Sequence, residues 1–469
     1  MRSTLLLSAI TLAFGGAARA QEGAAVEPTE PAPAPEAPSQ SPPPAPEAAS
    51  VPPALATEAP AAPAPAPPTV EAEKKATPVA GWKDGFFVAS EDGAYKLKIG
   101  GYLHADSRWF VDDEDEKLAD QFTFRRMRLD LGGTLAKILE FRFLPDFAGG
   151  RIVVQDAWVD LGLHPAFRLR VGKFKAPFGL ERLQSATALG FVERGFPTNL
   201  APNRDVGVQL WGDVAGGLVS WAAGVFDGVA DGASTDGDVT DDKEVAGRLF
   251  LQPFAPGKGL LKNVGAGAAV TAGDKQGTFA SPEVSPYKTT GQATFFTPVL
   301  GMDQATTVIA SGAHVRVTGQ GYAYVGPVGF LGEYARSSYE VALGDVEGKI
   351  IAQAWNAELF FVLTGEDASY KGVTPDHPLD LGDGTWGAFE LAARFHQLTI
   401  GDRTFDHGFA DPAKSARQAR AFGGGLRWHA TRSLRVYLDA EGTGFEGGAS
   451  GGGDRPTELV ILTRLQTLF

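Results

Sequence analysis

The stretch that decides the fold runs from Val171 to Gln209 and reads VGKFKAPFGLERLQSATALGFVERGFPTNLAPNRDVGVQ. It begins and ends as a β-strand. The connection between the two strands carries the basic residues Lys173, Lys175, Arg182, Arg194 and Arg204 among small and apolar ones. A connection of this length in a compact fold is unusual and tends to be functional. Because the flanking strands alternate as in a membrane barrel, we expect this loop to fold into a barrel lumen and form its constriction.

The N-terminus predicts export. Arg2 provides a positive start, residues 5–14 provide an apolar core, and Ala18-Arg19-Ala20 provides a cleavage site, so residues 1–20 are interpreted as a signal peptide. The apolar run is too short for a transmembrane helix. A buried N-terminal helix is the alternative, but it would not account for the cleavage site.

Residues 21–80 consist mainly of Pro, Ala and Glu, with almost no aromatic side chains. Such a segment cannot bury enough apolar surface to fold, so we expect a disordered, extended periplasmic arm. The arm is either a tether toward the cell wall or a spacer.

The chain has no cysteine, which excludes disulfides and metal sites built on thiolates.

Residues 81–469 lack an apolar run that could span as a helix, and instead show period-two alternation broken by Gly, Asp and Asn. A soluble β-sandwich alternates in the same way, so alternation alone does not separate the two folds. The export signal favours a barrel. So does the terminal strand ending at Phe469, which resembles the C-terminal assembly signal of bacterial outer-membrane proteins. We therefore expect the bacterial outer membrane as the location.

The predicted fold is all-β: a transmembrane antiparallel β-barrel of about 16 strands, with residues 175–204 as an inward-folded third outer loop. The expected strands cover residues 95–110, 122–135, 138–147, 152–163, 167–174, 205–214, 218–226, 245–251, 264–271, 314–325, 328–339, 350–363, 386–398, 421–429, 434–442 and 458–469. Residues 292–296 could form another strand, but an even strand count leaves them in a loop. The connection 365–385 is longer than a periplasmic turn should be, and the pattern does not explain it.

Arginines recur on the strand face that also carries polar or small residues. They are Arg126, Arg128, Arg142, Arg168, Arg170, Arg248, Arg316, Arg394, Arg427 and Arg435. A charge facing lipid at mid-depth costs roughly 2–4 kcal/mol, so we expect these side chains to point inward. An arginine keeps its charge in a narrow pore and can fork onto phosphate oxygens. The alternative for each is an ion pair that braces the wall, with acids such as Asp156, Asp160, Glu390 and Asp439.

The net charge of −14 does not exclude a basic lumen, because outer loops such as residues 112–116 and 231–242 hold much of the acid. No nucleotide, nucleic-acid or metal motif is present, so we expect no cofactor.

Several short motifs, in order and spacing, resemble the phosphate-selective porin family, porins O and P. They are FRRMRL at 124–129, EFRF at 140–143, DAWV at 156–159, GKFKAPFGLE at 172–181, FVER at 191–194, GVQL at 207–210, YAYVGP at 322–327, LTGE at 363–366 and FELAAR at 389–394. The resemblance covers most of residues 95–469. It implies a sixteen-stranded homotrimeric barrel in outer-membrane lipid that conducts small phosphate-like anions along a basic lumen.

By this resemblance, Arg125 and Arg126 match paired arginines near the constriction, and Arg182 and Ser185 match loop positions that contact the anion. Asp156 matches an acidic neighbour of these positions. The full candidate pore-lining set is Arg125, Arg126, Arg128, Arg142, Asp156, Arg182, Ser185, Arg316 and Arg394. Strict alternation cannot point both Arg125 and Arg126 inward without a β-bulge. We expect Arg126 and Arg182 to face each other across the constriction.

Three positions depart from the family pattern. The family has a second serine and a lysine after Ser185, where this chain has Ala186 and Thr187. Tyr102 stands where an arginine is expected on the first strand. Because fewer donors remain, we expect anion preference to persist better than selectivity for phosphate or polyphosphate.

Two other classes of protein compete with a channel. An outer-membrane hydrolase needs a nucleophile near a histidine and a carboxylate, and none of the 7 histidines lies in a serine-hydrolase motif. We therefore expect no enzyme and nominate no catalytic residue. A structural or adhesive barrel that holds the cell wall through its Pro-rich arm is the stronger alternative, and single-channel conductance separates it from a porin.

Overall fold

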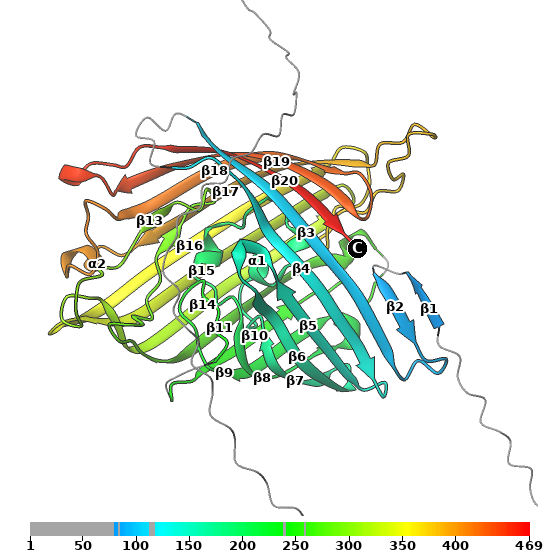
Figure 1. Ribbon diagram of the computed structural model, residues 1–469, viewed down its shortest axis with the longest axis horizontal. Helices are drawn as coiled ribbons and strands as arrows, with labels where there is room; N and C mark the ends of the chain where they lie inside the picture. Colours follow the sequence, from blue (N-terminus) through cyan, green and yellow to red (C-terminus); the bar gives the residue numbers. More distant parts are fainter. Residues whose placement is uncertain (1–78, 83–84, 112–117, 238–240, 258) are drawn as a thin grey trace, which may run out of the picture. The chain divides into compact units, whose positions relative to one another are not determined.

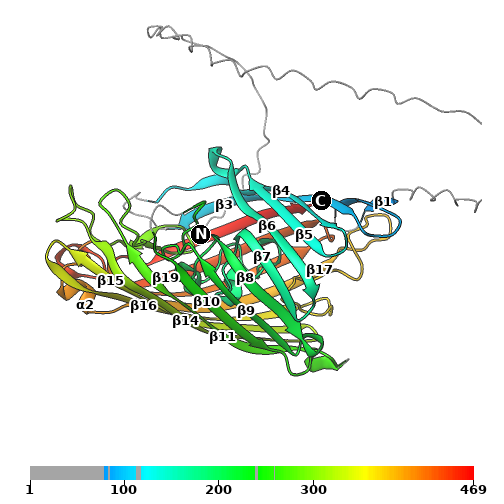
Figure 2. The same cartoon turned by 90° about the horizontal axis from the view of Figure 1, so that it is seen from below.

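The computed structural model describes residues 79–82, 85–111, 118–237, 241–257 and 259–469. Within them, sixteen antiparallel strands form a closed barrel. Each barrel strand pairs with the next one along the chain, and the last strand, β20 (Glu458–Leu468), pairs with the first, β3 (Lys96–Val111). Figures 1 and 2 show this ring of tilted strands from two directions. The predicted signal peptide and nearly all of the predicted arm lie outside the described residues.

The other barrel strands follow the predicted order. They are β4 (Gln121–Leu135), β5 (Leu139–Asp146), β6 (Val153–His164), β7 (Phe167–Phe174), β8 (Asp205–Val214), β9 (Val219–Phe226), β10 (Glu244–Leu251), β11 (Asn263–Gln276), β14 (Ile309–Val325), β15 (Val328–Leu343), β16 (Val346–Val362), β17 (Ala388–Ile400), β18 (Ala416–His429) and β19 (Leu434–Gly447). Every predicted strand is confirmed, and the bounds of β7 and β8 match to the residue.

The barrel wall places apolar side chains outside and polar ones inside. On β15, the apolar residues Phe330 and Tyr334 are 45% and 40% exposed. The polar residues Glu333 and Ser337 of the same strand are 5% and 1% exposed. A soluble sandwich would bury the apolar face instead. The alternation is therefore that of a barrel whose outer face suits lipid.

The helices are short and lie in the connections. They are α1 (Leu180–Leu183), α2 (Arg403–Asp406), η1 (Ala148–Gly150), η2 (Ala186–Ala188), η3 (Phe196–Asn199), η4 (Ala215–Gly217), η5 (Leu260–Lys262) and η6 (Ser450–Gly452). In the part of the chain that the structure describes, no helix is both long and apolar enough to cross a membrane.

A hairpin that the sequence did not predict precedes the barrel. It consists of β1 (Val79–Trp82) and β2 (Phe86–Ala89), so β1 begins two residues inside the segment interpreted as an arm. β2 pairs with β3 from Lys96 to Ile99, below the point where β20 pairs with Tyr102. The hairpin therefore extends the sheet along β3 beyond the end of β20.

The residues weighed as an extra strand do not join the barrel. β13 (Thr294–Phe296) pairs with β12 (Tyr287–Lys288) in a separate two-stranded sheet within the connection between β11 and β14. The prediction that they lie in a loop is confirmed, and the even strand count is kept.

The segment between β7 and β8 packs against strands on the other side of the strand order. Phe196 and Leu200 are buried in one apolar cluster with Ala335 of β15 and Ala354 of β16, which are register partners. Two adjacent alanines on the inner face leave room for the ring of Phe196.

Candidate functional site

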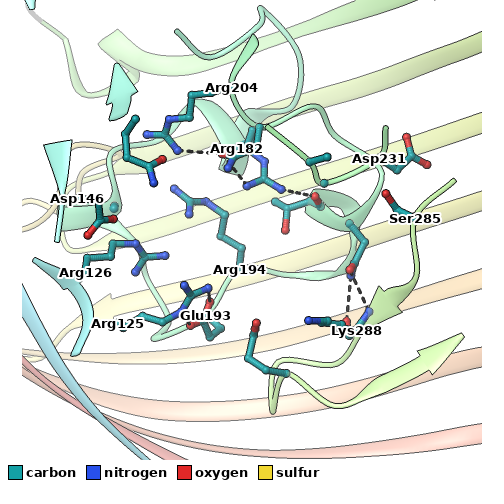
Figure 3. Close-up of a pocket in the computed structure, with 18 of the residues that line it drawn as sticks. Arg125, Arg126, Asp146, Arg182, Glu193, Arg194, Arg204, Asp231, Ser285 and Lys288 are labelled. Carbon is teal, nitrogen blue, oxygen red and sulfur yellow. Dashed lines mark hydrogen bonds and ion pairs between the residues drawn. The ribbon is translucent and has the colours of Figure 1, made fainter. Parts of the chain in front are cut away.

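A cavity of about 420 Å³ has a strongly basic lining, and we call it the arginine cavity. Its charged lining residues are Arg125, Arg126, Arg128, Arg182, Arg194, Arg204 and Lys288, against Asp146, Glu193 and Asp231. These side chains come from β4, from the end of β5, and from the connections between β7 and β8, between β9 and β10 and between β11 and β14 (Figure 3). Cations outnumber carboxylates, so the cavity attracts anions although the chain is acidic.

A β-bulge in β4 lets two consecutive arginines reach this cavity. His104 of β3 pairs with Arg126, and the next residue, Ala105, pairs with Phe124, so Arg125 has no register partner. The extra residue lets Arg125 and Arg126 point to the same side of the sheet, and both line the cavity. The bulge expected from strict alternation is thus present.

Three arginines of the cavity are paired with carboxylates. Arg125 Nε lies 2.5 Å from Glu193 Oε1, and Arg128 Nε lies 2.6 Å from Asp146 Oδ2. Arg204 Nε donates to Asp156 Oδ1 at 3.2 Å. The carboxylates largely balance the charges of these three arginines. The three side chains therefore contribute more to the form of the cavity than to its net positive charge.

Arg126, Arg182 and Arg194 have no carboxylate partner within the described residues. Arg126 Nη1 lies 3.2 Å from His104 Nδ1. Arg182 donates to Asn203 Oδ1 at 3.2 Å and to the carbonyl of Thr198. Arg194 donates to the carbonyls of Glu181 and Gln184 at 2.9 and 3.0 Å. Neutral acceptors orient these guanidinium groups and leave their charge uncompensated.

The crowding of positive charge perturbs the ionisation of the segment between β7 and β8. Burial, together with the charges of Arg194 and Arg204, lowers the pKa of Arg182 to about 9. Burial and the charge of Arg204 lower the pKa of Arg194 to about 10. Both groups remain charged at pH 7, so an anion that enters relieves their mutual repulsion.

Glu193 is perturbed in the opposite sense. Burial alone would raise its pKa, but the guanidinium groups of Arg125 and Arg126 outweigh burial and hold the pKa at about 2. Glu193 is therefore ionised throughout the physiological range and keeps Arg125 neutralised.

The structure divides the predicted site residues into three groups. Arg125, Arg126, Arg128 and Arg182 line the arginine cavity. Ser185 and Arg142 line a second cavity of about 650 Å³, which also contains Tyr102 and Trp158. Asp156 lies between the two cavities, because it accepts from Arg204 at 3.2 Å and from Arg142 at 3.0 Å.

Arg316 and Arg394 form the third group, which is buried in ion pairs. Arg316 lies 2.7 Å from both Asp231 and Glu244 and is 0% exposed. Arg394 lies 2.7 Å from Glu441. For these two arginines the bracing interpretation fits better than the pore-lining one, and neither lines the arginine cavity.

The candidate set from the sequence does not include three basic residues of the cavity. Arg194 lies in the FVER motif and Arg204 lies at the end of the connection 175–204, so both were within reach of the sequence. Lys288 lies in the connection between β11 and β14, which carries none of the recognised motifs. No sequence signal connects Lys288 to the cavity.

The long connection between β16 and β17, which the sequence pattern did not explain, contacts the same segment. Tyr370 Oη donates to the carbonyl of Leu180 at 2.6 Å, and Gln184 Nε2 donates to the carbonyl of Tyr370 at 2.8 Å. Arg435 of β19 donates to the carbonyls of Thr187 and Val373, which joins both segments to the wall. The length of this connection therefore has a structural use: it supports the segment between β7 and β8.

Three of the histidines make buried contacts that support the wall or the segment between β7 and β8. Phe196 N donates to His396 Nδ1 at 3.0 Å, His314 stacks on Tyr339 at 3.6 Å, and His429 Nε2 lies 3.0 Å from Glu390. Among the described residues, no group of three His, Cys, Asp or Glu side chains could hold a metal ion.

Comparisons with known proteins identify the family and the fold. A family model described as phosphate-selective porin O and P matches residues 97–443. Porin O of Pseudomonas aeruginosa is 25% identical over 429 residues, which cover 82% of this chain and 91% of that protein. The outer membrane channel DcaP of Acinetobacter baumannii superimposes with a TM-score of 0.51 at 11% identity, over 82% of this chain and 99% of that chain.

An anion-selective porin from Comamonas acidovorans superimposes with a TM-score of 0.50 at 12% identity, over 80% of this chain and 100% of that chain. At these identities the two solved structures support the barrel fold alone. The family model spans most of the barrel, and the family consists of outer-membrane channels and not of enzymes. The chain thus belongs to the phosphate-selective porin O and P family and resides in the bacterial outer membrane.

Proposed function

We propose that the protein is an anion-preferring diffusion channel whose constriction is formed by residues 175–204, folded into the barrel lumen. The hydrogen bonds of this segment support that placement. Val192 N donates to Asp439 of β19 at 2.6 Å, and Phe196 N donates to His396 of β17 at 3.0 Å. β17 and β19 are far from β7 and β8 in the strand order, so the segment crosses between opposite walls.

The observation that carries the proposal is the set of three unpaired guanidinium groups, Arg126, Arg182 and Arg194. An anion that enters a narrow passage loses hydration, and fixed charges and donors must replace its water. A guanidinium group meets both needs and keeps its charge. The carboxylate-paired arginines of the same cavity cannot do so without breaking an ion pair.

The solute class is small, phosphate-like anions. The curated relative named Porin O and the family description support phosphate as one candidate. Ala186 and Thr187 supply fewer donors than the family pattern, so chloride and other small anions should pass while phosphate is held weakly.

We also propose a homotrimer in outer-membrane lipid, as the family resemblance implies, with the Pro-rich arm as a tether toward the cell wall or a spacer.

The test is the reversal potential of single channels in a KCl gradient across a planar bilayer. The parent should favour chloride over potassium, and Arg126→Ala, Arg182→Ala and Arg194→Ala should each lower the permeability ratio while keeping an open channel. Arg420→Ala is the matched control, because Arg420 is exposed on β18, away from the arginine cavity, and donates to Gln397 at 3.0 Å. A parent without conductance would favour the structural or adhesive alternative.

A further inference from the structure

The backbone N–H and the backbone carbonyl of Leu180, at the start of α1, are each held by a distant side chain. Its N–H donates to Glu333 Oε1 at 2.9 Å, and its carbonyl accepts from Tyr370 Oη at 2.6 Å. Leu180 is 1% exposed, and these partners come from β15 and from the connection between β16 and β17. Two parts of the chain more than a hundred residues downstream thus fix the backbone of one residue in the predicted constriction.

Glu333 binds a turn shaped to receive its carboxylate. Glu181 N donates to Glu333 Oε2 at 3.1 Å, so each carboxylate oxygen accepts one backbone N–H. Gly179 has φ +80, and a Cβ there would lie 3.2 Å from Glu333 Oε1. A glycine is needed because this backbone conformation turns the next two N–H groups toward one oxygen pair. Thr318 of β14 donates to the same carboxylate at 3.3 Å.

Tyr370 is itself firmly placed. Its ring stacks on Tyr322 of β14, with centroids 5.0 Å apart and an interplanar angle of 19°. Its carbonyl accepts from Gln184, which follows α1. The connection between β16 and β17 therefore holds both the beginning and the end of α1.

Arg182 lies within α1, and no carboxylate among the described residues fixes its guanidinium group. Its contacts, Asn203 and the carbonyl of Thr198, are neutral groups of the same segment. The place of the charge therefore depends on where the backbone of α1 is held. A fixed charge that shifts by about 1 Å loses much of its effect on a dehydrated ion.

We propose that Glu333 and Tyr370 are positioning residues that set the place of Arg182 by holding the backbone N–H and carbonyl of Leu180, and that the channel loses anion preference when either bond is removed. This inference rests on the proposed function, because it assumes that Arg182 contributes to selectivity. Glu333 has no ion-pair partner within the described residues, and its carboxylate accepts instead from the backbone N–H groups of Leu180 and Glu181 and from the Thr318 hydroxyl.

The two clamp residues can be separated from simple charge effects. Glu333→Gln can only make the wall less negative, so electrostatics alone would raise the chloride-to-potassium permeability ratio or leave it unchanged. Loss of positioning lowers that ratio instead, because an amide N–H₂ replaces one acceptor of the backbone N–H groups. Tyr370→Phe removes only the hydroxyl group and keeps the ring on Tyr322, so it changes no charge.

The experiment measures the permeability ratio from reversal potentials in a KCl gradient for the full chain and five variants. Four of the variants are Tyr370→Phe, Glu333→Gln, Arg182→Ala and the double variant Arg182→Ala/Tyr370→Phe. The control is Tyr334→Phe, which removes a hydroxyl group bonded to Gln353 on the outer face of the same strand as Glu333. Heat-shifted mobility in gels verifies that each variant forms a barrel.

We expect Tyr370→Phe and Glu333→Gln each to lower the ratio by about twofold or more, the effect of one lost hydrogen bond. Tyr334→Phe should match the parent. In the Arg182→Ala background, Tyr370→Phe should add nothing, because the positioned charge is already gone. A general loosening of the barrel would lower the ratio in both backgrounds.

Two results would overturn the inference and are distinguishable. If Arg182→Ala lowers the ratio but Tyr370→Phe does not, the clamp has no role in selectivity and the proposed function stands. If Arg182→Ala leaves the ratio unchanged, the proposed function fails in its use of Arg182, and the clamp has nothing to position. Should Glu333→Gln fail to form a barrel, Tyr370→Phe alone decides between these results.

Discussion

Arg125 Nε donates to Glu193 Oε1 at 2.5 Å, and this ion pair joins the bulge of β4 to the segment between β7 and β8. The carbonyl of the same residue, Glu193, accepts from Arg394 of β17 at 2.7 Å. Glu193 therefore connects three parts of the barrel while neutralising one of two adjacent arginines. Arg126, the other arginine, keeps its charge for the cavity.

The ion pair of Glu193 should make the filter insensitive to moderate acid. Its pKa is about 2, below the usual 4.5, so its stabilising contribution is fully present above about pH 4.5 and is lost as the pH falls toward 2. Because Glu193 stays ionised over this range, its titration should not change the chloride-to-potassium permeability ratio between pH 7 and about pH 5. Reversal potentials across that range provide the measurement.

Glu193→Gln is the matched variant for this prediction. It frees Arg125 without changing side-chain size, so anion preference should rise at pH 7. A fall in anion preference in this variant would show that Glu193 acts by holding the segment and not by neutralising Arg125.

Arg316 should contribute to stability and not mainly to selectivity. Its guanidinium group is 0% exposed and lies 2.7 Å from both Asp231 and Glu244. Arg316→Met leaves two buried carboxylates without their cation, which costs about 3–5 kcal/mol. The midpoint temperature of the heat-shifted gel mobility should fall clearly, whereas Arg336→Met, on the exposed face of β15, should leave it near the parent value.

Phosphate should block the chloride current of the parent only weakly, and Ala186→Ser should strengthen the block. Ala186 is 7% exposed and lines the arginine cavity, so a hydroxyl group there adds a donor beside the unpaired arginines. A hydrogen bond to a charged group contributes about 1.5–3 kcal/mol, which predicts an increase in phosphate affinity of about tenfold or more. Titration of single-channel chloride current with phosphate measures it.

Ala357→Ser, which adds the same hydroxyl group at a position on β16 between the exposed residues Trp355 and Leu359, is the control for the phosphate prediction. Strong phosphate block of the parent, or equal block in both variants, would contradict the role assigned to Ala186.

The Pro-rich arm should be dispensable for conduction. Residues 21–78 lack side chains that could build a core, and the described residues begin with the β1–β2 hairpin, which precedes the barrel. A chain that keeps the signal peptide and lacks residues 21–78 should form the same barrel with the same conductance. Loss of the heat-shifted barrel form in this deletion would show that the arm takes part in folding.

The barrel strands could be predicted from the sequence because lipid outside and a polar lumen inside impose period-two alternation on every strand. Two features escaped this signal. The β1–β2 hairpin directly follows the Pro-rich segment, whose composition obscures it. The connection between β16 and β17 is irregular, so its support of α1 through Tyr370 has no periodic signature.

The candidate site was predicted in part, for a related reason. The β4 arginines and Arg182 lie in local motifs, and the bulge follows from two adjacent inward side chains. Which arginines are paired depends on contacts between distant segments. Asp231, the partner of Arg316, comes from an outer connection 85 residues earlier in the chain. Pairing across the barrel depends on register and loop placement, which alternation along one strand does not contain.

The most direct test of the account is the ion selectivity of the parent, Arg126→Glu and Arg182→Glu, recorded as reversal potentials in the same KCl gradient. Each substitution changes the local charge by two units, and two charges about 6 Å apart interact by roughly 3 kcal/mol at an effective dielectric constant near 20. This energy is large enough to change the constriction from a free-energy minimum for an anion into a free-energy barrier. We predict chloride preference in the parent and a shift toward potassium in both variants. Identical selectivity in all three proteins would contradict the claim that residues 175–204 and the arginine cavity form the filter.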